Sequence, residues 1–291
     1  MDEVIHIEGM GLLGALLAHR LDQRGEAFTW NDIDTPYSAW YCCTGLAYPD
    51  ADNRPGLVAW HKALADIPEA APAPYLYAHK RPPHGAQDAI VEDFGKLRLG
   101  AINAVSLNVP AFVHRMRKEH RDHRDAIYPD RTLVRCHTTP KRAGGYLWGW
   151  TAKVGLVFKD ERVASIAAVH QPALYAKAHR FNLTYAYPIP GEQLWWAGSS
   201  LVGQKEPKRV SDDRLQAYLD EWLFNAEMLL GVQGQVAGTV LQGWRPKAAP
   251  GDSGRAVRHP DGTWSMPPLA TDGMRNGLLV VDDFLDQWDT L

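Results

Sequence analysis

Residues 4–34, VIHIEGMGLLGALLAHRLDQRGEAFTWNDID, decide the fold of this chain. Val4, Ile5 and Ile7 predict a short strand, and Gly9-Met10-Gly11-Leu12-Leu13-Gly14 follows with the G-x-G-x-x-G spacing of a dinucleotide-binding turn. In such a turn the first glycine permits a sharp bend, the second leaves room for a pyrophosphate, and the third lets helix and strand pack closely. The stretch therefore predicts a dinucleotide site near the amino terminus.

The residues after the turn complete a strand–helix–strand unit. Leucines recur at helical spacing between Gly11 and Arg24, Gly25 ends the helix, and residues 27–30 predict a second strand parallel to the first. Asp32 then stands where a carboxylate accepts hydrogen bonds from ribose hydroxyls, and the helix N-terminus would direct N–H groups at the phosphates. A glycine-rich turn in an ordinary α/β protein is the alternative interpretation.

The composition and net charge are typical of a globular protein. The chain has 291 residues, of which 45% are hydrophobic and 22% charged, so it is long enough for two globular domains. A net charge of −3 predicts no overall attraction to nucleic acid or anionic membranes. No stretch approaches the ~20 apolar residues that span a bilayer. Cys42, Cys43 and Cys136 fit neither a disulfide framework nor a zinc site, so we expect a cytoplasmic protein without a bound metal.

Read together, several motifs resemble the FAD-dependent amine oxidases of the D-amino-acid oxidase type. This family includes glycine oxidase, sarcosine oxidase and the oxidase domain of the tRNA carboxymethylaminomethyl-uridine enzyme. Besides the turn and Asp32, the stretch Ser38–Pro49 is similar to the segment that passes along the flavin. YAYPIPGEQLWWAGSS at 185–200, GWRP at 243–246 and DGMRNGLL at 272–279 are similar to the family's substrate hairpin, Gly-Leu-Arg-Pro and Gly-His-x-Arg-Asn-Gly-Ile-Leu motifs.

The resemblance implies an α/β fold in which a Rossmann-type FAD-binding domain carries a second, mixed-sheet substrate domain, shortened relative to the family. The FAD-binding domain would comprise residues 1–50, 97–172 and 240–291, and the substrate domain residues 51–96 and 173–239. One family motif is missing, because GGYLWGW at 144–150 does not match the Ala-Ala-Gly-Ala-Trp-like turn that closes the flavin domain.

The resemblance also assigns site residues. Arg245 would bind a substrate carboxylate through its planar guanidinium, Tyr185 would support it, and Arg275 would act from the C-terminal motif. The residues implied to bind FAD are Gly9, Met10, Gly11, Leu13, Gly14, Asp32, Ser38, Gly45, Leu46, Gly273, Met274, Arg275, Asn276, Gly277 and Leu278. Gly273 replaces the family's histidine, and Val280-Val281 replaces its Ala-Pro. No cysteine lies near this motif, so FAD is expected to be non-covalent.

The implied reaction is FAD-dependent oxidation of the C–N bond of a glycine-like amine, R–NH–CH2–COO−, which releases glyoxylate and R–NH2. R would be either small or a nucleobase of modified DNA or RNA, of the glycinyl-thymine or carboxymethylaminomethyl-uridine type. The second possibility follows from a basic helix near residues 110–123, although such charge runs are usually solvated helix faces. The basic patch would comprise Arg115, Arg117, Lys118, Arg121 and Arg124. A nucleotide-binding protein without turnover and an NAD-dependent reductase are the alternatives.

Overall fold

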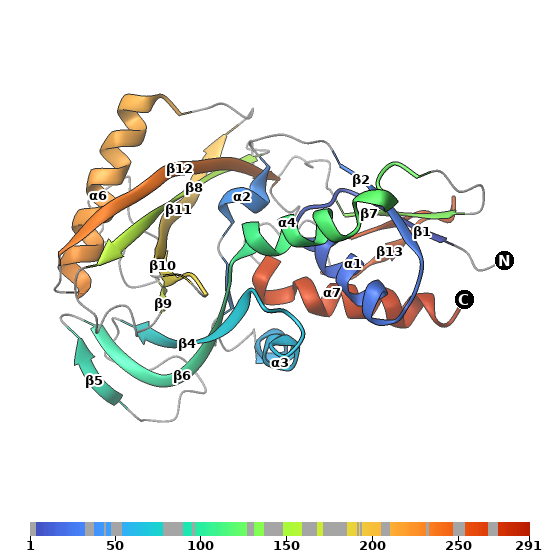
Figure 1. Cartoon of the computed structure of the whole chain (residues 1–291), viewed down its shortest axis with the longest axis horizontal. Helices are drawn as coiled ribbons and strands as arrows, with labels where there is room; N and C mark the ends of the chain where they lie inside the picture. Colours follow the sequence, from blue (N-terminus) through green and yellow to red (C-terminus); the bar gives the residue numbers. More distant parts are fainter. Residues whose placement is uncertain are drawn as a thin grey trace.

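Two β-sheets with their helices form the fold, and both chain ends lie at the side of the smaller sheet (Figure 1). The computed structural model describes residues 4–32, 38–43, 45–47, 54–77, 90–94, 97–126, 131–136, 148–158, 168–170, 185–190, 192, 194–204, 210–230, 233–246, 254–266 and 273–291. Within these ranges, no helix is both long and apolar enough to cross a membrane.

The smaller sheet has five strands in the order β13-β14-β7-β1-β2. β1 (Val4–Glu8) lies between β2 (Phe28–Asn31) and β7 (Arg131–Arg135) and is parallel to both. β14 (Trp264–Ser265) is parallel to β7, and β13 (Val257–Arg258) is antiparallel to β14. α1 (Leu12–Gln23) connects β1 to β2, which confirms the strand–helix–strand unit predicted from the sequence.

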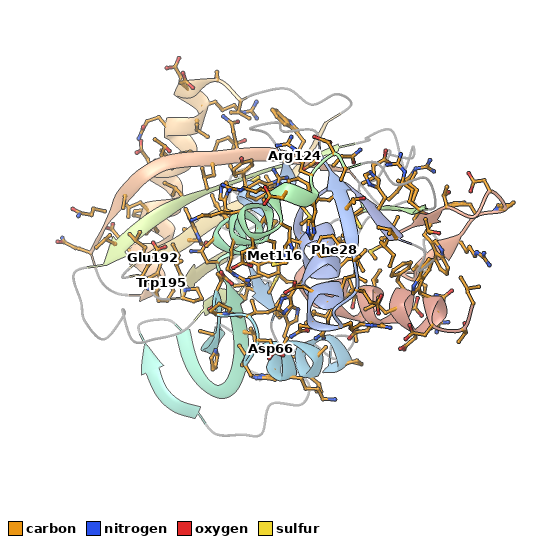
Figure 2. All side chains as sticks on the ribbon, turned by 45° about the vertical axis from the view of Figure 1, so that its right-hand side comes forward. Phe28, Asp66, Met116, Arg124, Glu192 and Trp195 are labelled. Atoms are coloured by element: carbon orange, nitrogen blue, oxygen red, sulfur yellow. The ribbon has the colours of Figure 1, made fainter. Side chains whose placement is uncertain are left out.

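Helices α1, α3 (Arg54–Ala63), α4 (Val109–Glu119) and α7 (Gly273–Trp288) share a hydrophobic core with this sheet. α1 contacts both α4 and α7, and α3 contacts α7. The α1 leucines that recur at helical spacing supply its buried face. The core also contains Phe28 of β2 and Met116 of α4, both labelled in Figure 2. Asn108 begins α4, where its side-chain oxygen accepts a hydrogen bond from the Ala111 N–H at 3.3 Å.

The larger sheet has nine strands, eight of them in the order β12-β8-β11-β10-β9-β4-β6-β3, with β5 paired to β6. β4 and β9 are parallel, whereas the other neighbours are antiparallel, so the second sheet is mixed as predicted. The strands are β3 (Leu46–Ala47), β4 (Ala70–Tyr77), β5 (Ile90–Phe94), β6 (Leu97–Leu107), β8 (Trp148–Phe158), β9 (Ala168–His170), β10 (Tyr185–Pro188), β11 (Trp195–Gln204) and β12 (Gly234–Pro246).

Three further helices complete the described structure. α6 (Asp212–Leu230) contacts β11 and β12, and the short α2 (Ala39–Cys42) contacts β8 and β12 (Figure 1). The 3-10 turn η1 (Arg121–His123) follows α4 and contacts β2. The larger sheet takes β3, β6, β8, β9 and part of β12 from segments predicted for the FAD-binding domain, and the assignment of segments to domains stays a prediction.

Candidate functional site

The glycine turn after β1 has the geometry that its spacing predicts. Gly9 adopts φ +100°, a left-handed conformation that favours glycine. A Cβ added to Gly14 would lie 2.2 Å from the Gly9 carbonyl oxygen, so only glycine lets α1 approach the turn this closely. Among the described residues, a Cβ added to Gly11 would meet only Trp40 within 4 Å, at 3.5 Å, so these residues leave room for a ligand beside Gly11.

The N-terminus of α1 suits a phosphate group. Gly11 is the N-cap residue and makes no side-chain cap, and the first turn contains no acidic residue. Helix N–H groups at such an end need acceptors, and the helix dipole favours a negative charge there. The geometry therefore fits the predicted pyrophosphate position.

Asp32 lies beside this turn and forms an ion pair with Arg117 of α4. The Arg117 Nε and Nη2 atoms also donate hydrogen bonds to the Met10 carbonyl, at 3.0 and 2.8 Å. The guanidinium lies 4.9 Å from the centre of a Trp40 ring and 6.0 Å from that of Trp30. Burial lowers the pKa of Arg117 to about 10. The sequence predicted Arg117 as part of a surface patch. In the structure its side chain instead contacts the glycine turn and Asp32.

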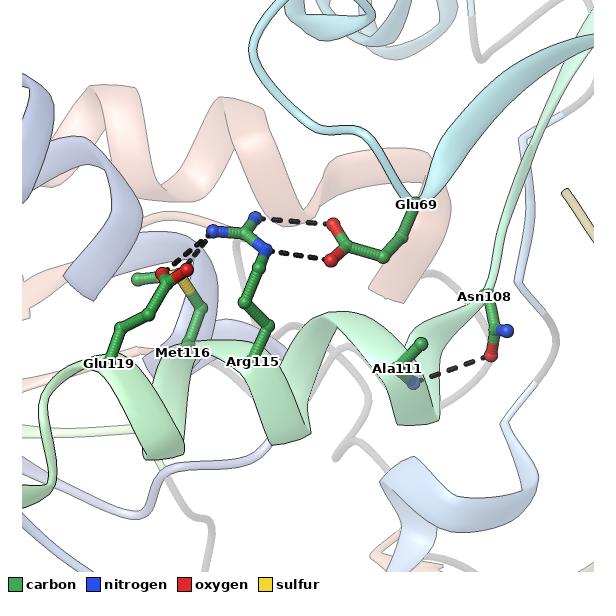
Figure 3. A network of polar contacts seen from close by, with 6 residues as sticks. All are labelled: Glu69, Asn108, Ala111, Arg115, Met116 and Glu119. Atoms are coloured by element: carbon green, nitrogen blue, oxygen red, sulfur yellow. Dashed lines mark hydrogen bonds and ion pairs between the residues drawn. The ribbon is translucent and has the colours of Figure 1, made fainter. Parts of the chain in front are cut away.

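Arg115, another residue of the predicted basic patch, also forms ion pairs within the chain. Arg115 pairs with Glu69 through two hydrogen bonds of 2.7 and 3.2 Å and with Glu119 at 2.9 Å (Figure 3). Arg115 and Arg117 are therefore engaged in internal ion pairs. The exposed members of the predicted patch are Lys118, Arg121 and Arg124. The structure does not support the predicted nucleic-acid patch.

The stretch that begins at Ser38 connects the dinucleotide turn to the larger sheet. Trp40 lies next to Gly11, and the backbone of Ser38 forms a parallel bridge to Trp244 of β12. The Gly45 carbonyl accepts a hydrogen bond from the Leu107 N–H at 2.7 Å. Leu46 then pairs with β6 in β3. Thr44 and residues 48–49 of this stretch lie outside the described residues.

The C-terminal motif forms the start of α7 and lies against α1. A Cβ added to Gly277 would lie 3.0 Å from Leu16 Cδ1 and 3.6 Å from Leu13 Cδ2. The Met274 carbonyl accepts a hydrogen bond from Trp60 Nε1, and α7 also contacts β3. The structure thus brings the two predicted FAD-binding motifs together. Asn276 is half-buried and Leu278 is buried in this region.

The larger sheet places the predicted substrate residues on one face. In the strand register Tyr185 is opposite Gly198, which is opposite Lys153, and Arg245 is opposite Gly149. Alternate residues of a strand share a face, and so do directly opposite residues. Positions 185, 153 and 245 therefore share one face of the sheet. The backbones of Tyr185, Arg245 and Arg275 are described, but their side chains lie outside the described part of the structure.

Lys153 is a buried cation on this face that sequence reasoning did not assign to the site. It is 0% exposed, and its Nζ donates a hydrogen bond to the Cys43 carbonyl at 3.3 Å. The Nζ atom also lies 4.6 Å from the centre of the Trp196 ring. Burial lowers the pKa of Lys153. Burying a lysine side chain is costly for folding unless its charge is compensated, so Lys153 is a candidate for the site on this face.

We expect Lys153→Met to keep the free energy of unfolding within about 1 kcal/mol of the wild type at pH 7, or to increase it, because an apolar side chain removes a desolvated charge. Because the pKa of Lys153 is lower in the folded chain, the unfolded chain binds more protons at this residue between the folded-state pKa and the ordinary lysine value. Wild-type stability should thus rise with pH in the window below the ordinary lysine value of about 10.5. The variant should lose this rise.

Urea unfolding at several pH values from 7 to 10.5 measures this difference. Lys118→Met, which alters an exposed lysine, is the matched control and should retain the wild-type pH dependence. A loss of more than about 3 kcal/mol in Lys153→Met would instead identify Lys153 as a structural cation.

The sequence carries a weak signal for Lys153 and none that sets Arg117 apart from the other basic residues of its helix. Lys153 interrupts the apolar run of β8, and a lysine inside a buried strand indicates a special environment. Arg117 lies in a helix rich in basic residues, where nothing in the spacing distinguishes it from its neighbours. Its contact with Asp32 spans 85 positions of the sequence.

The chain has the fold of FAD-dependent amino-acid oxidases. It superimposes on iminodiacetate oxidase from Chelativorans sp. BNC1 with a TM-score of 0.69 and 13% identity, covering 96% of this chain and 93% of that one. For glycine oxidase from Geobacillus kaustophilus the TM-score is 0.65, with 12% identity and coverage of 99% and 95%. For L-amino acid deaminase from Proteus vulgaris these values are 0.65, 11%, 98% and 94%. No protein-family model and no curated protein sequence matches the chain.

Proposed function

We propose that this protein is an FAD-dependent oxidoreductase that oxidises the C–N bond of a small glycine-like amine, R–NH–CH2–COO−. One observation carries the proposal: the dinucleotide turn, the stretch from Ser38 and the start of α7 meet beside the sheet that holds Tyr185, Lys153 and Arg245 on one face. The fold shared with iminodiacetate oxidase and glycine oxidase supports this assignment.

The described residues fit FAD. The described residues leave space beside Gly11 at the N-terminus of α1, where a pyrophosphate would accept hydrogen bonds from backbone N–H groups. Asp32 would accept hydrogen bonds from the ribose hydroxyls. The backbone at the start of α7 would face the flavin ring, because a helix N-terminus stabilises negative charge. The stretch from Ser38 to Leu46 would lie along the flavin between these two ends.

When bound, FAD supplies the redox chemistry by accepting two electrons from the carbon between the amine and the carboxylate. The chain would supply orientation. Arg245 would bind the carboxylate through a bidentate pair, and Tyr185 would donate a hydrogen bond to it. Lys153, when protonated, would place a positive charge on the same face. Its attraction for the carboxylate would be stronger where water is excluded. Loss of two electrons and two protons would convert the CH–NH unit of the substrate into a C=N bond, and hydrolysis of that bond would give glyoxylate and R–NH2.

A small R group agrees better with the described residues than a nucleobase in DNA or RNA. Nucleic-acid binding would need several basic side chains directed at phosphates. Arg115 and Arg117 instead bind Glu69 and Asp32 within the chain. We therefore propose a free secondary or primary amine that carries a carboxymethyl group.

The test is the visible absorption spectrum of the purified protein, followed by anaerobic addition of candidate amines. Flavin bands should be present, or should form with added FAD, and should bleach with iminodiacetate, sarcosine or glycine. Glyoxylate and the amine should then be detected as products. Methylamine, which has no carboxylate, is the matched control and should leave the bands unchanged.

Three other outcomes identify the alternatives. A protein that binds FAD but is bleached by no carboxymethyl amine would be a nucleotide-binding protein without this turnover. A colourless protein that takes up no FAD but binds NAD would be a nicotinamide-dependent reductase. Bleaching only by a glycine-bearing nucleoside or DNA would assign R to a nucleobase.

A further inference from the structure

The Arg117 side chain contacts the glycine turn and two segments that lie beside it. It donates two hydrogen bonds to the Met10 carbonyl, at 3.0 and 2.8 Å, and its Nη2 atom pairs with Asp32. Its guanidinium also lies 4.9 Å from the centre of a Trp40 ring, and Trp40 in turn borders Gly11. The Arg117 and Asp32 side chains are only 14% and 15% exposed, so water screens this pair weakly.

Arg117 compensates the negative charge of Asp32 beside the glycine turn. Asp32 brings a carboxylate close to the place where the pyrophosphate, itself an anion, would bind. Two uncompensated negative charges at close range would weaken cofactor binding. A guanidinium offers a planar set of N–H donors, so Arg117 can neutralise Asp32 and hold the Met10 carbonyl at the same time. A lysine side chain could not make all three hydrogen bonds in this geometry.

We propose that Arg117 is a cofactor-positioning residue, which orients Asp32 toward the ribose of FAD and compensates the negative charge beside the pyrophosphate. It acts on the adenosine half of the cofactor, because Asp32 and the glycine turn serve that half. The inference rests on the proposed FAD site. It predicts that the loss of Arg117 weakens FAD far more than a flavin that lacks the adenosine half.

The experiment measures the Kd values of FAD and FMN for the apo-protein by isothermal titration calorimetry. Arg117→Met should weaken FAD binding at least about tenfold, because it leaves Asp32 without its cation in a poorly solvated place. FMN binding should change by less than about twofold, since FMN has no adenosine ribose that the Asp32 carboxylate could contact. The ratio of the two Kd values therefore separates positioning from a general loss of structure.

Three further variants make the test specific. Arg117→Lys should restore part of the FAD affinity, because it returns the charge without the planar donors. Arg121→Met is the matched control, because Arg121 lies on η1 close by and is exposed. In a double-mutant cycle, Asp32→Asn and Arg117→Met should be non-additive for FAD, because the two side chains are in contact. If Arg117→Met is too unstable to measure, Arg117→Lys replaces it in the same cycle with Asp32→Asn.

Three outcomes would overturn the inference. A wild-type protein that binds FAD, together with an Arg117→Met variant that binds it equally well, would overturn it while leaving the proposed function intact. A wild-type protein that binds neither FAD nor FMN would overturn both. Tight binding of NADP+ that depends on Arg117 would mean that this residue accepts a 2′-phosphate instead.

Discussion

Gly14→Ala should lower the free energy of unfolding by about 3 kcal/mol or more, because the new methyl group has no room. Its Cβ would lie 2.2 Å from the Gly9 carbonyl oxygen and 3.2 Å from Ile7 Cγ2. The neighbour is backbone and cannot rotate away, so α1 must move off β1. In a chain of this size the loss corresponds to a fall in Tm of about 6–12 °C. Thermal unfolding of the apo-protein measures it.

Gly11→Ala provides the matched control, because it is the same change three residues away. In the described part of the chain, its Cβ would meet only Trp40 within 4 Å, at an ordinary contact distance of 3.5 Å. The Tm of the apo-protein should stay close to that of the wild type, whereas FAD affinity should fall at least about tenfold because a methyl group occupies the approach of the pyrophosphate. Equal stability of Gly14→Ala and wild type, or unchanged FAD affinity in Gly11→Ala, would contradict this division of roles.

Arg245→Met should lower kcat/KM for a carboxymethyl amine by about 10-fold to 150-fold, because a charge-assisted pair contributes about 1.5–3 kcal/mol. The loss should be greatest for the substrate that carries a carboxylate. For the corresponding amide, which carries no charge, the variant should be nearly as active as the wild type. Steady-state kinetics on this pair of substrates measure how far Arg245 distinguishes carboxylate from amide.

The FAD content of Arg245→Met should equal that of the wild type, since Arg245 lies in β12 of the larger sheet and not at the dinucleotide turn. Arg245→Lys should recover only part of the activity, because an ammonium cannot pair with the carboxylate in the bidentate manner. Arg255→Met, at an exposed arginine ten positions further along the chain, is the control for loss of a positive charge. If the variant retained full discrimination between carboxylate and amide, another residue would bind the carboxylate.

The amino-terminal unit illustrates what could be predicted from the sequence. The glycine spacing, the leucine periodicity and the position of Asp32 predicted β1, the turn, α1 and β2, and the structure confirms all four. These features depend on contacts between residues that are close in the chain. Backbone conformation at Gly9 and close packing at Gly14 follow from residue type alone, so a short stretch carries the information.

The resemblance to amine oxidases made it possible to predict features that depend on motifs far apart in the sequence. It predicted a second, mixed sheet, and the structure confirms it. It also assigned the Gly9–Gly14 and Gly273–Leu278 motifs to one cofactor, and the structure places α1 against α7. The charge pattern of α4 was less informative, because a helix rich in arginine shows nothing of what each arginine contacts.

The sequence by itself determined the dinucleotide turn, the class of fold and the positions of the motifs, because local spacing and residue type specify them. Only the tertiary structure decided that Arg117 pairs with Asp32 and that Lys153 is buried between Cys43 and Trp196. Both results depend on how α4 and β8 pack against segments far away in the sequence. The charge of a side chain can be read from its type, but its desolvation and its partner follow from the packing that surrounds it.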